Sequence, residues 1–310
     1  MQNDGLVNEL FQSERDYDYE MVCGAIEEKS YPSYFKLPEE ATGTQKDQKH
    51  IGACVAMTIS SIAEAYWNKT LGVKQEHSEG YIYGRLRADA SKGYGMIIST
   101  ALEKWKEIGT VPKYCYDILI EMPEMKEEVL KHKEELDEIA KQYRLSGFVR
   151  LRDNSTSTRD QQIKDALLKY GYGLLMASNG HCTQIVGWDD EKDVYIYKDS
   201  YGSDVGDNGY KNKRKSSVDQ VWLPIFEPIT LPFEDVKESD WFYKDVQNVY
   251  LSGIMKGTSE TTFSPNKNLT RAEAATLINR IRKENQEIIK ILNKVIQNKQ
   301  ILKEEGKVVL

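Results

Sequence analysis

A cysteine stands where a polar loop gives way to an apolar run, in the segment DQKHIGACVAMTISSIAEAYW at residues 47 to 67. A cysteine at the start of a helix is activated, because the first-turn N–H groups and the helix dipole stabilise its thiolate. A free cysteine beside alanine and valine is, however, more often a small core residue. Cys54 is therefore a candidate nucleophile only if the chain also supplies a base.

Four histidines could act as that base. His132 lies in a charged, helix-like segment and is expected to be solvated, and His77 lies in the polar sequence KQEHSEG. His50 is too close in sequence to the thiol to point at a helix start. His181 opens a strand-like run, and Asp199 follows across what reads as a hairpin. A thiol, a base and an orienting group from separate segments match the logic of nucleophilic catalysis, with His181 as the base.

The elements that must position these residues fall into two groups. Helix-like segments dominate the first half, at residues 51–67, 96–111, 122–143 (one helix or a pair) and 161–173. Strand-like runs follow, at residues 173–178, 181–189, 193–199 and 220–225. Helices first and strands later predict an α+β domain with a helical half and a β half.

Composition excludes several classes of protein. The chain has 310 residues, 40% of them hydrophobic and 29% charged, as in globular domains. Its formal net charge of −7 argues against nucleic acid as a partner. No apolar run approaches the roughly 20 residues of a membrane span, and the first residues do not read as a signal peptide. The four scattered cysteines fit neither a disulfide scaffold nor a zinc site, so no metal or cofactor is expected.

Two blocks resemble the papain-like cysteine peptidases, in the branch with bacterial members. The family's Q-x5-C signature matches Gln48 to Cys54, with GAC in place of GSC. Its second block, a histidine followed by NSWG and WGxxGY, is similar to His181 followed by YKDSYGSDVGDNGY. The resemblance covers residues 30 to 225 and implies a two-lobed fold, with a helical lobe and a β-barrel-like lobe.

The resemblance also implies a mechanism of peptide-bond hydrolysis. Cys54 would be the thiolate nucleophile, and His181 would donate a proton to the leaving amine and later activate water. Asp199 would hold the His181 ring. Gln48 and the backbone N–H of Cys54 would form the oxyanion hole.

Three further residues are carried over as substrate-binding positions. The loop that contains Gly93 and Gly95 falls where the family pairs its backbone with the substrate, and Tyr201 replaces a tryptophan that shields the histidine contact. The family's third catalytic residue is normally asparagine, and here it is Asp199. Its charge favours the thiolate–imidazolium pair but could hold the imidazolium so firmly that proton donation slows.

A second unit is expected at residues 233 to 281, with a helix, a glycine-containing turn and a second helix N-capped by Thr270. Such a unit is too small to bury a full core alone. It resembles an S-layer homology module through its FxDV, GIxxG and FxPxxxLTRAE elements. The resemblance implies binding of anionic, pyruvylated cell-wall polysaccharide through Arg271, with Asp235 and Trp241 as further glycan contacts or as structural residues.

The expected organisation is a short N-terminal segment, a peptidase-like domain, a linker, the module and a C-terminal amphipathic helix, at residues 1–29, 30–227, 228–232, 233–281 and 282–310. In that last segment Ile281, Ile288, Val295 and Leu302 recur every seven residues. This repeat predicts either a short three-stranded coiled coil in a homotrimer or one helix packed on its own chain.

Three functions fit these patterns. The first is an endopeptidase that acts on protein or peptide substrates outside the cell, anchored to the wall of a bacterium or meeting it as part of a phage or another particle. The second is a catalytically weak or inactive papain-like adaptor that binds peptides or partners at the cell surface. The third is another Cys/His acyl-transfer reaction, such as amide cleavage in peptidoglycan, although Gln48 before the cysteine favours the papain pattern.

Overall fold

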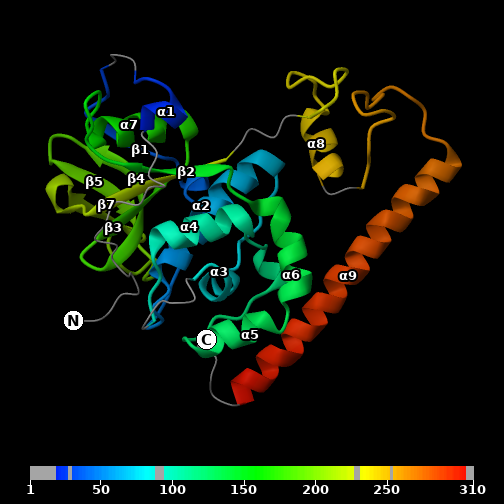
Figure 1. Ribbon diagram of the computed structural model, residues 1–310, viewed down its shortest axis with the longest axis horizontal. Helices are drawn as coiled ribbons and strands as arrows, with labels where there is room; N and C mark the ends of the chain where they lie inside the picture. The colour runs from blue at the N-terminus through cyan, green and yellow to red at the C-terminus, as the bar shows by residue number, and fades with distance from the viewer. Residues whose placement is uncertain (1–18, 27–29, 88–93, 227–230, 252–253, 305–310) are drawn as a thin grey trace.

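The computed structural model describes residues 19–26, 30–87, 94–226, 231–251 and 254–304, and a larger unit within it places a helical half beside one antiparallel sheet (Figure 1). The helices of this unit are α1 (Tyr19–Cys23), α2 (Cys54–Leu71), α3 (Glu79–Arg85), α4 (Ile98–Glu107), α5 (Glu124–Leu130), α6 (Lys133–Ala140) and α7 (Arg159–Tyr170). Short 3-10 turns are η1 (Glu39–Ala41), η2 (Lys113–Cys115), η3 (Lys141–Tyr143) and η4 (Lys215–Ser217). The predicted α+β class, with a helical half and a β half, is confirmed.

The sheet has seven strands in the order β2-β7-β3-β4-β5-β6, and β1 pairs with the far end of β4. The strands are β1 (Tyr34–Lys36), β2 (Gly147–Leu151), β3 (Leu174–Ser178), β4 (His181–Asp189), β5 (Val194–Lys198), β6 (Tyr210–Arg214) and β7 (Gln220–Ile225). All strand pairs are antiparallel. Sequence analysis found β3, β4, β5 and β7 but not the three others; of these, β1 has only three residues and β6 is rich in charged residues.

The helix α2 forms the centre of the helical half. It begins at Cys54 and ends at Gly72, whose φ of 67° is the left-handed conformation that favours glycine after a helix. Nearly all of its first three turns is buried, because it lies between β4 and the other helices. A sequence that is apolar on all sides of a helix predicts that the helix is buried. The prediction of a helix over 51–67 is confirmed.

The strand β4 is buried on both faces along almost its whole length, which is why its sequence lacks a polar and apolar alternation. It packs against α2 on one side and contacts α7. It pairs with β5 as an antiparallel hairpin in which Gln184 lies opposite Lys198. The predicted hairpin is therefore present, and it brings the residue after β5 beside the start of β4.

Part of the N-terminal segment contacts the larger unit. Tyr19 and Cys23 of α1 are buried in the core of that unit, and the Tyr19 hydroxyl donates to Asp165 of α7 at 2.8 Å. Two side chains that precede the expected domain start at residue 30 therefore belong to this core.

A second, smaller core lies C-terminal to the sheet and includes side chains of α8 (Tyr243–Leu251). The long helix α9 (Arg271–Glu304) follows it in the chain (Figure 1). Phe233, Val236, Tyr243 and Val246 form this core, and it is separate from the core of the larger unit. Two side chains of α8 reach α2: Lys244 Nζ and Asn248 Nδ2 donate to the carbonyls of Thr70 and Leu71, at 3.0 and 2.7 Å.

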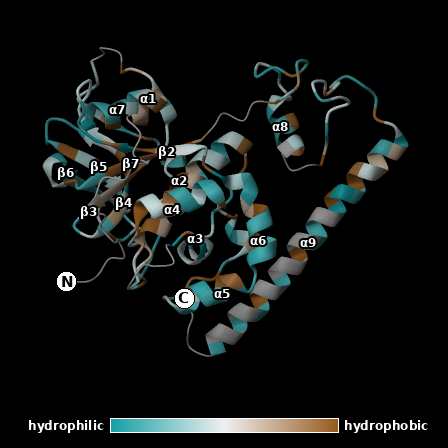
Figure 2. Cartoon of the chain, viewed as in Figure 1, coloured by the Kyte–Doolittle hydropathy of each residue, from teal (hydrophilic) through white to brown (hydrophobic). Residues whose placement is uncertain are grey.

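The helix α9 runs without interruption through the expected boundary at residue 281. At its start Thr270 and Glu273 form the predicted capping box, with N–H to side-chain distances of 2.8 and 3.1 Å. In the coloured part of this helix in Figure 2, hydrophobic and hydrophilic residues are interspersed, and Ile281 is 42% exposed. The side chains of Ile288, Val295 and Leu302 lie outside the described residues. Within the described chain, each helix is too short or too polar to cross a membrane.

Candidate active site

The packing of α2 on β4 brings the predicted thiol and base together. Thr58, one turn after Cys54, has its hydroxyl 3.0 Å from the Cys54 carbonyl and 3.3 Å from the carbonyl of Cys182 in β4. His181 immediately precedes Cys182, and its side chain interacts with the thiol. The Nδ1 atom of His181 has no hydrogen-bond partner among the described residues, and it is the ring nitrogen that does not contact Asp199.

The opposite ring nitrogen of His181 contacts the predicted orienting residue. His181 Nε2 lies 2.8 Å from Asp199 Oδ1, and the Ser200 N–H donates to the same oxygen at 2.9 Å. Lys211 Nζ lies 2.8 Å from the second oxygen, Oδ2. The ring of Tyr201 stacks on the imidazole, with centroids 5.3 Å apart and an angle of 20° between the planes. The ring is therefore held at its edge and on one face.

The electrostatics of this group follow from burial and pairing. Burial lowers the pKa of His181, but its interactions with Asp199 and Cys54 outweigh burial and raise this pKa to about 9. Burial raises the pKa of Asp199, but His181 and Lys211 outweigh it and lower the pKa to about 2. Burial also raises the pKa of the Cys54 thiol, and His181 acts in the opposite direction. At neutral pH the imidazole is therefore protonated beside a carboxylate.

Gln48 is brought to the same place by backbone pairing. Its N–H donates to the Ser200 carbonyl at 2.8 Å, and its side-chain oxygen accepts from the Ser200 hydroxyl at 2.5 Å. Its side-chain Nε2 donates to the Ile51 carbonyl at 2.9 Å. An amide nitrogen carries two N–H groups, so one remains for a ligand.

The glycine loop is only partly described. Gly93 lies outside the described residues. Gly95 is buried, and its carbonyl accepts from Arg87 Nε at 2.9 Å, while the neighbouring Tyr94 carbonyl accepts from the Tyr83 hydroxyl at 2.5 Å. The carbonyls of Tyr94 and Gly95 therefore already accept hydrogen bonds from side chains of the protein itself.

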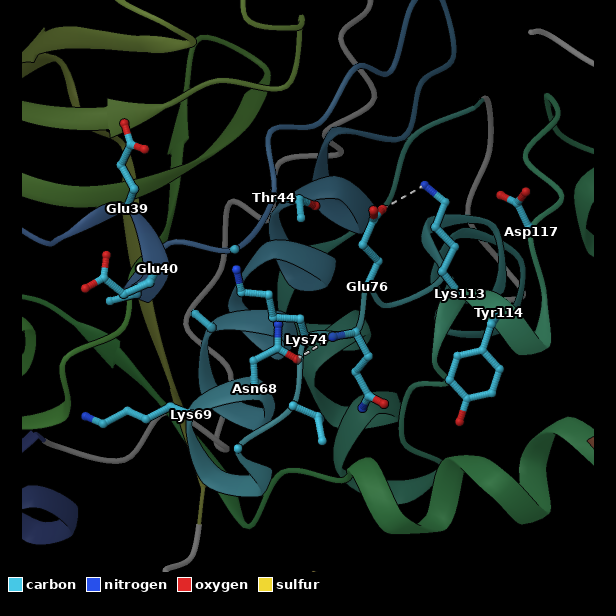
Figure 3. A pocket seen from close by; sticks show the side chains of 16 residues that line it. Glu39, Glu40, Thr44, Asn68, Lys69, Lys74, Glu76, Lys113, Tyr114 and Asp117 are labelled. Carbon is cyan, nitrogen blue, oxygen red and sulfur yellow. Dashed lines mark hydrogen bonds and ion pairs between the residues drawn. The ribbon is translucent and has the colours of Figure 1, made fainter. Parts of the chain in front are cut away.

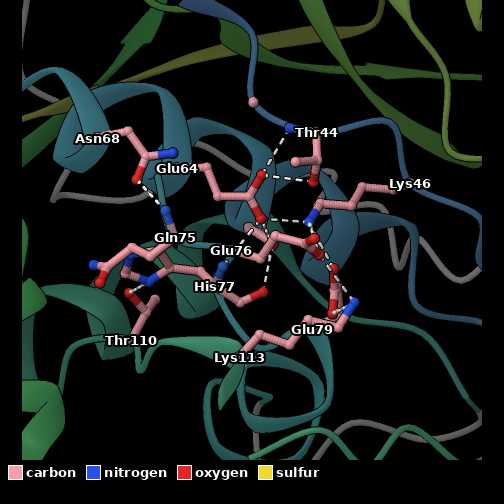
Figure 4. A network of polar contacts seen from close by, with 12 residues as sticks. Thr44, Lys46, Glu64, Asn68, Gln75, Glu76, His77, Glu79, Thr110 and Lys113 are labelled. Atoms are coloured by element: carbon pink, nitrogen blue, oxygen red, sulfur yellow. Dashed lines mark hydrogen bonds and ion pairs between the residues drawn. The ribbon is translucent and has the colours of Figure 1, made fainter. Parts of the chain in front are cut away.

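A buried charged network was not predicted from the sequence (Figure 4). Lys46, 4% exposed, forms ion pairs with Glu64, 0% exposed, and with Glu79 at 2.7 Å. The carboxylate of Glu64 also accepts the backbone N–H of Thr44 at 2.7 Å and of His77 at 3.0 Å. Lys46 precedes Gln48 by two residues, so this network anchors the loop that carries Gln48 to α2 and α3.

The network is also the place where carboxylates gather. Oxygens of Glu64, Glu76 and Glu79 lie within 4.8 Å of one another. The ammonium of Lys46 already lies among these three carboxylates and supplies the positive charge that a metal ion would bring. The arrangement is therefore an ion-pair cluster rather than a metal site.

Two histidines are more buried than expected. His77 is 0% exposed, and burial lowers its pKa to about 3, so it is neutral. His132 is 5% exposed, and its ring lies 6.1 Å from that of Tyr116. The expectation that His132 is solvated is therefore wrong, because the charged helices α5 and α6 bury one face of their sequence.

A cavity of about 1390 Å³ lies between η1, the second half of α2 and η2 (Figure 3). Its polar side chains include Lys69, Lys74, Glu76 and Lys113, and the last two form an ion pair at 3.2 Å. Its lining contains neither Cys54 nor any other predicted catalytic residue. This cavity is thus separate from the thiol and the imidazole.

Solved structures match the larger unit. Xylellain, a cysteine protease from Xylella fastidiosa, superposes with a TM-score of 0.56 at 18% identity, covering 72% of this chain and 96% of that one. The digestive procathepsin L2 proteinase from the Tenebrio molitor larval midgut gives a TM-score of 0.54 at 16% identity, covering 72% and 78%. The larger unit has the papain-like fold. At these identities the likeness concerns the fold of this papain-like domain.

The smaller unit is matched by sequence. Residues 232–275 fit the family model of the S-layer homology domain. The Surface-layer 125 kDa protein of Lysinibacillus sphaericus is 46% identical over 46 residues, and an Endoglucanase of Bacillus sp. (strain KSM-635) is 39% identical over 49 residues. These matches span 15% and 16% of this chain but only 4% and 5% of the two relatives. The chain thus carries an S-layer homology domain after its papain-like domain.

The three predicted glycan residues of the S-layer homology domain have different surroundings. Both oxygens of Asp235 accept backbone N–H groups, from Phe263 at 2.8 Å and Ser264 at 2.7 Å, so this carboxylate fixes a turn inside the module. Trp241 is 88% exposed, with only an edge contact to its neighbour Phe242. Arg271 is exposed in the first turn of α9. Two of the three are therefore presented to solvent.

Proposed function

We propose that the chain is a papain-like cysteine endopeptidase held at a bacterial cell wall by its S-layer homology domain. The observation that carries this proposal is the convergence of Cys54, His181 and Asp199, which come from α2, β4 and the end of β5. A protonated imidazole hydrogen-bonded to a carboxylate on one side and next to a thiol on the other is the arrangement that activates a cysteine nucleophile.

The proposed reaction begins when the sulfur of Cys54 attacks the carbonyl carbon of the scissile peptide bond as a thiolate. The oxygen that gains the negative charge is bound by the Cys54 N–H at the start of α2 and by the second N–H of Gln48 Nε2. His181 then gives its proton to the leaving amine, which breaks the C–N bond and leaves a thioester. The neutral imidazole next takes a proton from water, whose oxygen attacks the thioester and releases the acid product and the thiol.

The test is covalent labelling of the thiol. Wild-type protein is expected to react with an epoxide inhibitor directed at papain-like peptidases and to cleave a casein substrate, and Cys54→Ala is expected to lose both properties. Cys115→Ala is the matched control, because this thiol is also free and buried but lies in η2. Unlabelled wild-type protein that carries an accessible Cys54 would contradict the proposal.

The position at the cell wall rests on the S-layer homology domain. We infer that it binds an anionic, pyruvylated wall polysaccharide, with the guanidinium of Arg271 on the carboxylate and Trp241 stacked on a sugar ring. Exposure of both side chains supports this inference. Asp235 would act indirectly, by holding the turn at Phe263 and Ser264. The expected place of action is outside the cell, on surface or wall-associated protein.

A second candidate function is a catalytically weak papain-like adaptor, and the burial of Cys54 favours it. The sulfur-bearing residue is 0% exposed, and burial raises its pKa. An adaptor would bind peptides in the same cleft without cutting them. A peptide library that yields measurable binding, with no new termini found by mass spectrometry, would support the adaptor over the peptidase.

A further inference from the structure

Lys211 contacts the proposed triad, although sequence analysis did not single it out. It lies in β6 opposite Tyr197 of β5, and its Nζ is 2.8 Å from Oδ2 of Asp199. The other carboxylate oxygen is 2.8 Å from His181 Nε2 and 2.9 Å from the Ser200 N–H. One carboxylate is therefore shared between an imidazole and an ammonium, with a separate oxygen for each.

The backbone near this lysine leaves room for its side chain. Gly206 has a φ of +64°, and a Cβ atom added there would lie 2.8 Å from Lys211 Cγ and 2.2 Å from the Tyr210 carbonyl oxygen. Glycine at this position therefore lets the lysine stem pass close to the loop backbone. The Lys211 side chain is 34% exposed and that of Asp199 only 4%, so the ammonium meets the carboxylate at the edge of the buried region.

The charge of this lysine balances a departure from the family pattern. An asparagine beside His181 would orient the ring without adding charge, whereas Asp199 adds one negative charge next to the imidazolium. The ammonium of Lys211 cancels that charge at the far oxygen. Other ionisable groups that interact with the pair are the Cys54 thiol from α2 and the phenol of Tyr197 from β5, and the Tyr201 ring stacks on the imidazole.

We propose that Lys211 is a positioning residue that neutralises Asp199 and thereby limits how tightly the carboxylate binds the His181 ring. The proposal rests on the proposed peptidase function for its effect on turnover. Without Lys211 the imidazolium would be held more strongly and would give up its proton to the leaving amine more slowly. With an amide in place of Asp199, Lys211 would instead become an unbalanced cation beside the imidazolium.

The expected behaviour is a compensating pair of substitutions. Lys211→Met should move the alkaline limit of kcat/KM upward by about one pH unit and lower kcat about tenfold. Asp199→Asn should move the alkaline limit downward and also lower kcat. The double variant, Lys211→Met with Asp199→Asn, restores a neutral pair and should be more active than either single variant. Lys211→Arg keeps the charge and should stay within about threefold of wild type.

The experiment measures two readouts on the full chain. One is the pH profile of peptide hydrolysis, and the other is the pH profile of Cys54 alkylation by iodoacetamide, which follows the thiol and imidazole without any peptide substrate. Lys213→Met is the matched control, because Lys213 lies two residues further along β6. Melting temperatures of all variants separate a charge effect from loss of folding.

The result that overturns the proposal is a double variant in which the two single losses multiply, with an unchanged alkaline limit for Lys211→Met in both readouts. If wild type cuts no peptide but the alkylation profile moves as expected, the proposed function fails and the role of Lys211 stands. If wild type is active and Lys211→Met behaves like Lys213→Met, the proposed function stands and the role of Lys211 fails.

Discussion

Replacing Lys46 by methionine would test how the buried charges hold the loop that carries Gln48. Lys46 is 4% exposed and pairs with two buried carboxylates, Glu64 and Glu79. Methionine has a similar length but no charge, so the substitution removes the cation and leaves the volume nearly filled. Removing one partner of a buried ion pair costs about 3–5 kcal/mol, because the remaining charge loses its compensation without regaining water.

The structure places the expected cost near the lower end of that range. Glu79 keeps a second cation, since Lys113 Nζ lies 3.3 Å from its Oε2 atom, whereas the hydrogen-bond donors that remain on Glu64, such as the Thr44 and His77 N–H groups, are neutral. One carboxylate is therefore left uncompensated, and we expect a loss of about 3 kcal/mol. For a domain of this size the melting temperature should fall by about 6–12 °C.

The pH dependence gives the prediction a sign. Burial raises the pKa of Glu79, but Lys46 and Lys113 outweigh it and lower this pKa, so in wild type its contribution to stability is lost as the pH falls. Without Lys46 the pKa of Glu79 is lowered less, so the variant loses less stability than wild type over the same fall in pH. The difference in unfolding free energy between wild type and Lys46→Met should therefore shrink between pH 7.5 and pH 4.5.

The assay is urea unfolding followed by tryptophan fluorescence at both pH values. Adding Glu64→Gln to Lys46→Met removes the unpaired charge but keeps an acceptor oxygen for only one of the two N–H groups, so it should recover part of the loss. Lys49→Met is the matched control, because its pair with Asp47 at 2.6 Å is on the surface and should contribute little. A Lys46→Met variant as stable as Lys49→Met would refute the reasoning.

Two further predictions concern function. Because the pKa of His181 is about 9, peptide hydrolysis should persist at pH 8 and decline as the pH rises through 9, where the imidazolium loses its proton. A fluorogenic peptide assay checks this, and a decline centred near pH 6.5 would contradict it. Arg271→Ala should weaken binding to pyruvylated wall polysaccharide about tenfold or more in a sedimentation assay. Arg282 is exposed on the same helix, and Arg282→Ala should bind as wild type does. Equal losses in the two variants would indicate non-specific charge attraction.

The local elements were readable from the sequence. The apolar run after Cys54 predicts a buried helix, and Thr270 with Glu273 predicts a helix start; both features depend on residues near each other in the chain. The motif spacing also indicated both units, and the structural and sequence comparisons confirm the papain-like fold and the S-layer homology domain. The packing of α1 on the larger core and the continuation of α9 past residue 281 leave no change of composition in the sequence, so composition does not reveal them.

The contacts of the candidate site were decided by tertiary structure. A hairpin between His181 and Asp199 could be expected, but the place of Lys211 depends on the register of β6 against β5, which charged strand residues do not reveal. His77 reads as a loop residue and is fully buried, because helices distant in sequence close over it.

The sequence by itself determined the motifs of both units and the helices and strands in which the motif residues lie. These local features depend on residues that are neighbours in the chain. Only the tertiary structure decided that Lys46, Glu64 and Glu79 share one buried network and that Lys211 joins Asp199. From composition alone, charged side chains are expected to be exposed to solvent. Their burial depends on the packing of elements that are distant in sequence, which excludes water from between them.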